Sequence, residues 1–274
     1  MKRIRVFYIL TIFCLLFTAC NQPSLSNKEN RYQEKKGHSG DMDKESNVNP
    51  DDKNTGEPDV IESVYPLSFK EVQTPMKKFE EFEVINKETI EEVVREERFG
   101  KYTFIIYSKK DEDHQDYAGF LIEGNFTDIY EIGKIGYRSD LNPYTIENVN
   151  LFSKNYLAMR GICGANCPIT YYVDIYNDEL PSLFLGMEAN GTETDISGDG
   201  INELIATVGT HIETTVYIEE DGHLFHSDRF AIPGTVQVFY NKDDNKFHIA
   251  FENKKIGNYE YKDKQLHFVE LKEL

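Results

Sequence analysis

From Lys101 onward, runs rich in tyrosine, phenylalanine and β-branched residues recur along the chain, and turn-forming residues separate them. Acidic, asparagine and glycine residues mark these turns, as at Glu123–Asn125, Asp221–Gly222 and Asp243–Asn245. The spacing of about one run per ten to twelve residues is typical of antiparallel hairpins. The sequence therefore predicts an all-β, mainly antiparallel domain. We expect a propeller-like arrangement, with a β-sandwich as the alternative.

The expected strands follow one another without long interruptions. Their bounds are Tyr102–Ser108, Tyr117–Ile122, Thr127–Ile132, Asn148–Phe152, Tyr156–Gly161, Ile169–Tyr176, Ser182–Gly186, Glu203–Val208, Thr214–Ile218, His223–His226, Thr235–Tyr240, Lys246–Phe251, Asn258–Tyr261 and Gln265–Leu271. One short N-terminal helix is expected before them, over Glu88–Arg98, because Ile90, Val93 and Val94 recur at helical spacing. Asn86 is its expected N-cap, and Gly100 ends it.

The N-terminus carries the second strong signal. Lys2, Arg3 and Arg5 precede an uncharged apolar run over Val6–Phe17, which has the length of a signal-peptide core. The run ends in Leu-Phe-Thr-Ala-Cys20, which resembles the lipobox of bacterial lipoproteins. That resemblance implies cleavage after residue 19 and a diacylated Cys20 that carries chains such as palmitate. An ordinary secretory signal that happens to contain Cys20 is the alternative.

The composition of the remaining chain predicts its domain organisation. Residues 20–62 are polar with isolated apolar side chains, so they are expected to form a lipidated, disordered tether before one β-rich domain over 63–274. Loss of the three basic residues of the signal leaves 27 Lys and Arg against 48 Asp and Glu, a net charge of −21. Such acidity disfavours nucleic-acid binding. We expect the lipid to hold the protein at the extracytoplasmic face of the cell membrane. The expected partner there is an unknown envelope protein or polymer.

The stretch from Asp195 to Leu204 places oxygen-bearing side chains at alternate positions before a strand. A turn of this kind can direct several oxygens at a Ca²⁺ ion, and Gly198 and Gly200 allow the tight backbone. The predicted ligands are Asp195, Ser197, Asp199, the carbonyl of Ile201, and Glu203. Ala206 stands where an EF-hand needs its bidentate glutamate. The stretch resembles the calcium loop of FG-GAP and VCBS-type β-propeller repeats, which implies a structural Ca²⁺. A polar turn without metal is the alternative.

Cys163 and Cys167 are expected to form a local disulfide between two strands, because exported proteins retain disulfides. A soft-metal or redox site is the alternative for this pair. His223 and His226 would point to opposite faces of a strand, so a shared metal site is not expected.

The sequence favours a binding or envelope-interaction role for the Ca²⁺-stabilised domain. The sequence lacks the signatures of serine hydrolases, zinc proteases, phosphate-binding loops and dinucleotide-binding sites. Their absence disfavours an enzymatic function. An extracytoplasmic hydrolase of wall polymer or glycan is the alternative, and a structural accessory or inhibitory lipoprotein is a third class.

Overall fold

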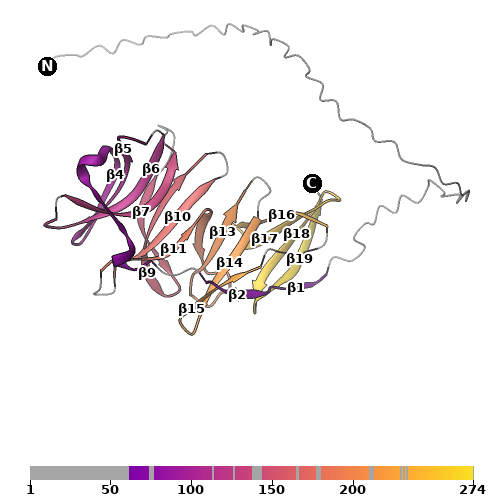
Figure 1. The fold of residues 1–274 in the computed structure, drawn as a ribbon. Coiled ribbons are helices and arrows are strands. Elements are labelled where there is room, and N and C mark those ends of the chain that lie inside the picture. Colours follow the sequence, from indigo (N-terminus) through magenta and orange to yellow (C-terminus); the bar gives the residue numbers. More distant parts are fainter. Residues whose placement is uncertain are drawn as a thin grey trace, which may run out of the picture. The chain divides into compact units, whose positions relative to one another are not determined.

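The computed structural model describes residues 62–273, apart from 74–76, 113, 126, 138–143, 165–166, 177–179, 210–212, 229, 231 and 233. Cys20, the predicted signal peptide and nearly all of the predicted tether lie outside the described residues. The described residues form antiparallel sheets, which confirms the all-β prediction (Figure 1). No helix within them has the length and hydropathy to cross a bilayer.

The strands form four sheets, which we number along the chain. The first sheet has the order β3 (Glu83–Asn86), β7 (Asp128–Tyr137), β6 (Gln115–Ile122), β5 (Tyr102–Lys109) and β4 (Ile90–Phe99). The second has the order β11 (Ser182–Met187), β10 (Pro168–Asp174), β9 (Lys154–Ile162) and β8 (Thr145–Leu151). The third has the order β12 (Asn190–Thr194), β13 (Glu203–Val208), β14 (Glu213–Glu220), β15 (His223–Ser227) and β2 (Phe69–Glu71). The fourth has the order β1 (Val64–Pro66), β19 (Gln265–Glu273), β18 (Lys255–Lys262), β17 (Lys246–Phe251) and β16 (Thr235–Asn241).

Within each sheet, strands that follow one another in sequence pair as hairpins. The exceptions are β3, which pairs with β7 in the first sheet, and the N-terminal strands β1 and β2, which pair with β19 and β15 (Figure 1). The short segments β1 and β2 thus add an outer strand to the fourth and third sheets, which are otherwise built from residues far along the sequence.

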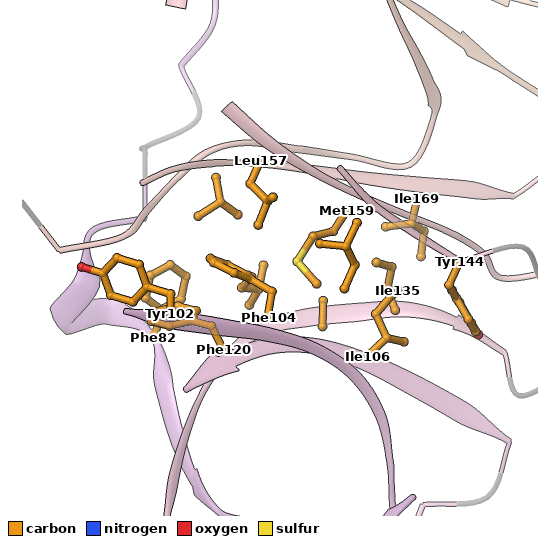
Figure 2. Packing of buried hydrophobic residues seen from close by; sticks show 14 residues of the cluster. Phe82, Tyr102, Phe104, Ile106, Phe120, Ile135, Tyr144, Leu157, Met159 and Ile169 are labelled. Carbon is orange, nitrogen blue, oxygen red and sulfur yellow. The ribbon is translucent and has the colours of Figure 1, made fainter. Parts of the chain in front are cut away.

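Neighbouring sheets pack face to face, and the second sheet is buried on both faces. Leu157 and Met159 of β9 pack against Phe104 and other residues of the first sheet (Figure 2). The alternate residues Tyr156 and Ala158 belong to the cluster that contacts the third sheet. Because successive side chains of a strand point to opposite faces, a strand buried on both sides reads as an apolar run. This explains the sequence Tyr-Leu-Ala-Met at 156–159.

The third sheet repeats this pattern between the second and fourth sheets. Leu204 of β13 joins the cluster shared with the second sheet, and Ile205 joins the cluster shared with Phe247 and Ile249 of the fourth. Face-to-face packing of antiparallel meanders is common to sandwiches and to propeller blades. The packing is therefore compatible with both expected architectures, and the propeller stays a prediction.

The first sheet curls, because bulges interrupt the pairing of β4 with β5 and of β6 with β7. The face turned away from the second sheet buries a small cluster that includes Ile105, Tyr107 and Ile129. An ion pair completes this face, with Lys109 Nζ 2.9 Å from Glu131 Oε2. The Tyr107 hydroxyl also donates to Glu131, at 2.5 Å.

The prediction of a helix over Glu88–Arg98 is wrong, because Ile90–Phe99 is strand β4. A hairpin turn at Gly100, with φ of 59°, brings the segment alongside β5. The pairing of eight of its ten residues with β5 outweighs the local helical spacing. Asn86 does cap a helix, since its side chain accepts the amide of Glu88 at 2.8 Å. The capped element is the 3₁₀ turn η2 (Lys87–Thr89), which follows a similar turn, η1 (Phe79–Glu81).

The expected strands from Tyr102 onward all coincide with observed strands, with bounds that shift by a few residues. The strands that the sequence did not predict are β1, β2, β3, β4 and β12.

Candidate functional site

The stretch from Asp195 to Asn202 is the loop of the β12–β13 hairpin, closed by the pair of Thr194 with Glu203. Gly198 and Gly200 have φ of 78° and 88°, which is the left-handed region. A Cβ atom at either position would meet no other atom within 4 Å. Glycine is therefore required at these two positions by the backbone conformation and not by lack of space.

The carboxylate of Asp195 organises this loop. Its Oδ1 accepts the backbone amides of Gly198 at 2.6 Å and Asp199 at 3.1 Å, and its Oδ2 accepts that of Gly200 at 2.9 Å. Asp199 Oδ1 in turn accepts the amide of Ile201 at 2.8 Å. Charge-assisted bonds to successive amides fix the turn from within.

Glu203 supplies a buried carboxylate at the base of the loop. Its side chain accepts the amide of Ile196 at 2.9 Å, and the residue is 7% exposed. Burial raises the pKa of Glu203, and the negative charge of Asp199 adds to the rise. The bonds from the Ile196 amide and the Ser197 hydroxyl act in the opposite direction but do not cancel the effect of burial.

Pairwise contacts link four of the five predicted calcium ligands, namely Asp195, Ser197, Asp199 and Glu203. Ser197 Oγ lies 3.5 Å from Asp195 Oδ1 and also bonds Glu203, which interacts with Asp199. Ile201 is 40% exposed, and its amide faces Asp199. Among the described residues, no set of three acidic, histidine or cysteine side chains is arranged to hold a metal ion. Calcium binding therefore stays a prediction.

The loop also joins three sheets, through residues that the sequence did not mark. The Asn202 side chain donates to the carbonyl of Asn150 at 3.0 Å, and the amide of Phe152 donates to the carbonyl of Asn202 at 2.9 Å. Asn245, in the β16–β17 hairpin, donates to the carbonyl of Asp195 at 3.5 Å. Ile196 is buried in the cluster between the third and fourth sheets. A change in the loop therefore affects contacts in the second, third and fourth sheets.

A cavity of about 370 Å³ adjoins the loop. Its acidic lining residues are Asp199, Glu203 and Glu219, and its basic one is Lys154. Lys154 Nζ lies 3.0 Å from Glu219 Oε2, so one of the three acids is already paired. Lys154 and Glu219 stand far from the loop in sequence, and no local pattern pointed to them.

The other candidate residues lie elsewhere. Cys163 and Cys167 form a disulfide at the end of the β9–β10 hairpin, with Cα atoms 5.1 Å apart. His223 Nδ1 lies 2.7 Å from Glu71 Oε1, whereas His226 Nδ1 lies 3.1 Å from the carbonyl of Ser227. The two histidines therefore have separate partners.

No known protein-family model, curated protein sequence or solved structure matches this chain.

Proposed function

We propose that this protein is a lipid-anchored binding protein of the extracytoplasmic face of the membrane, with a β-rich domain that a structural Ca²⁺ ion stabilises. The observation that carries the calcium proposal is the buried carboxylate of Glu203 beside Asp199 in the loop that Asp195 organises. A divalent cation there would offset the repulsion and desolvation that raise the pKa of Glu203. Asp195 Oδ2 and Asp199 Oδ1 each accept one amide and so retain a lone pair for a cation.

The proposed role of the ion is structural because the loop contacts three sheets. Contacts through Asn202, Asn245 and Ile196 connect it to the second and fourth sheets. With two aspartates and one glutamate as the charged ligands, the affinity expected of an extracellular module is on the order of 1 mM. At that affinity, roughly 10 mM Ca²⁺ adds about 1.4 kcal/mol to the free energy of unfolding.

Thermal unfolding of the purified full chain tests the calcium proposal. We expect roughly 10 mM Ca²⁺, compared with chelator, to raise the melting temperature by about 3–6 °C, and Mg²⁺ to raise it less. The variant Asp199→Ala should lose the response, because it removes one of the three charged ligands, whose hydrogen bond within the loop is to the amide of Ile201. Asp243→Ala is the matched control, since Asp243 lies in another hairpin turn. An unchanged melting temperature in the wild-type protein would show that the loop is a polar turn that binds no metal.

The anchor has its own test, because Cys20 lies outside the described residues. We expect the wild-type chain to partition with membranes when expressed in a bacterium, and Cys20→Ala to be released into the soluble fraction. Membrane partition of the Cys20→Ala variant would overturn the lipid anchor and leave the binding domain without its proposed location.

A hydrolase of wall polymer or glycan is the second candidate, and the cavity beside the loop favours it. Glu203, with its raised pKa, and Asp199 both line this cavity, and an acid with a raised pKa beside an ionised carboxylate is the pair that glycoside hydrolysis uses. Reducing-end release from purified wall polymer separates the candidates. Turnover that Glu203→Gln abolishes would support the hydrolase, and no turnover by the wild-type chain would eliminate it.

A further inference from the structure

A second cavity, of about 480 Å³, lies where the first and second sheets meet. Ile169, one of its lining residues, lies at the same end of the packed cluster as Ile135 and Tyr144 (Figure 2). No residue of the Asp195–Glu203 loop lines this cavity. Its volume falls within the range of sites that bind small molecules, and it is separate from the site described above.

Tyr171 is a fixed wall of the cavity. Its hydroxyl donates to the carbonyl of Lys134 at 2.6 Å, which links β10 of the second sheet to β7 of the first. Its ring packs on Gly186, where a Cβ atom would lie 3.0 Å from the ring. Burial raises the pKa of Tyr171 to about 12, so the hydroxyl remains a donor at neutral pH. The ring is therefore held in place before any ligand arrives.

Tyr137 is the accessible wall. It ends β7, it is 47% exposed, and its ring lies 3.9 Å from the position of a Cβ atom at Gly164. Gly164 belongs to the short loop that the Cys163–Cys167 disulfide closes, and Cys163 itself lines the cavity. The disulfide thus supports the surface on which the Tyr137 ring rests.

The polar groups around the two rings carry no net charge. They are the amide of Gln115, the ammonium of Lys134 and the carboxylate of Glu188. No ion pair joins Lys134 or Glu188 to another group in the part of the chain that the structure describes. Together these groups offer both donors and acceptors, which suits a neutral ligand with several hydroxyl groups. An anionic ligand is disfavoured by a single cation on a chain of net charge −18.

We propose that this cavity binds a neutral carbohydrate of one or two pyranose rings. The flat apolar face of a sugar ring stacks on Tyr137 and Tyr171, its carbon atoms contact Ile169 and Met187, and its hydroxyl groups bond Gln115, Lys134 and Glu188. This assigns a ligand class to a site that is independent of the calcium loop. Loss of calcium binding would therefore leave the carbohydrate site standing, and the reverse also holds.

Titration of the purified full chain with neutral sugars tests the proposal, with N-acetylglucosamine, glucose and their dimers as probes. We expect saturable binding with a Kd on the order of 0.1–1 mM by calorimetry or ligand-observed NMR. Tyr137→Ala should weaken binding at least fivefold, and Tyr137→Phe should retain it. Tyr176→Ala is the matched control, because Tyr176 is also 47% exposed and lies outside the cavity.

Variants at exposed positions keep the test independent of folding. Lys134→Met and Glu188→Gln, at exposed positions, should each weaken binding about twofold to fivefold, since each removes one hydrogen bond to a hydroxyl. Serine at both Cys163 and Cys167 should weaken binding through the loss of support for Tyr137. Asp195→Ala should leave sugar affinity unchanged.

Three outcomes would overturn the proposal. The first is no saturable binding of any of these sugars at roughly 10 mM. The second is sugar binding that Tyr137→Ala leaves unchanged, which would place the site elsewhere. The third is Tyr137-dependent binding of a zwitterionic dipeptide such as Gly-Leu in place of sugars, which would assign a peptide ligand to the cavity.

Discussion

Removal of the Asp195 carboxylate is expected to destabilise the domain even when no calcium is present. The carboxylate accepts three backbone amides, from Gly198, Asp199 and Gly200. In Asp195→Ala these amides lose their acceptor and regain water, because the loop from 197 to 200 is exposed. Loss of a helix cap, a comparable change, costs about 0.5–2 kcal/mol. With three amides affected, we expect a loss of about 2 kcal/mol in the free energy of unfolding.

Asp195→Asn refines this expectation, because asparagine keeps one acceptor oxygen. It can retain the bonds from Gly198 and Asp199 to Oδ1 while losing the bond from Gly200 to Oδ2. We expect about half the effect of the alanine variant, without the charge assistance. Urea denaturation in chelator should therefore order the proteins as wild type, asparagine, alanine in decreasing stability.

The thermal equivalent is a fall of about 4–8 °C in melting temperature for Asp195→Ala, since one kcal/mol corresponds to about 2–4 °C in a domain of this size. A loss below about 0.5 kcal/mol in chelator would refute the reasoning, because surface substitutions without structural partners have effects of that size. An effect that appears only when Ca²⁺ is added would show that the ion, and not the amide bonds, holds the loop.

Three further expectations concern groups outside this carboxylate. Because the pKa of Glu203 is raised on folding, its stabilising contribution is present at low pH and is lost as pH rises through the folded pKa. Without calcium, the wild-type protein should therefore lose more stability between about pH 4.5 and pH 7 than Glu203→Gln does, as measured by urea denaturation. Glu131→Ala should cost about 3 kcal/mol in the same assay, because it leaves the mostly buried Lys109 with only the more distant Glu112 and removes the acceptor of the buried Tyr107 hydroxyl; a cost under 1 kcal/mol would contradict this. Serine at both Cys163 and Cys167 should cost about 2 kcal/mol, as the entropy of a five-residue ring predicts, and a reductant should then have no additional effect.

Local sequence was sufficient for most strands because their apolar runs and turns lie side by side in the chain. It failed where pairing partners are distant or where the strand itself is polar. Strands β1 and β2 are three residues long and pair with β19 and β15, so their own residues carry little signal. Strand β12 reads Asn-Gly-Thr-Glu-Thr, which lacks an apolar alternation. In β4, the exposed valines Val93 and Val94 mimic a helical stripe.

The same distinction between local and distant contacts explains which site residues the sequence could predict. The Asp195–Glu203 loop was recognisable because its glycines and acids act on one another within nine residues. The walls of the two cavities come from different hairpins. Lys154 and Glu219 form an ion pair across the second and third sheets, and Tyr137 of the first sheet and Tyr171 of the second line the same cavity. Such pairs depend on sheet packing, which no local spacing encodes.

The pairing of β1 with β19 has a consequence for the order of folding. Tyr65 opposes Leu266, and its ring lies 5.6 Å from that of Tyr259, so the fourth sheet closes on residues separated by about 200 positions. Closing a loop of that length costs about 4.7 kcal/mol of chain entropy, more than any of the local hairpins. The hairpins can therefore form from residues that are close in sequence, whereas β1 docks only after β18 and β19 have formed. The slow phase of refolding should accordingly follow the burial of Tyr65.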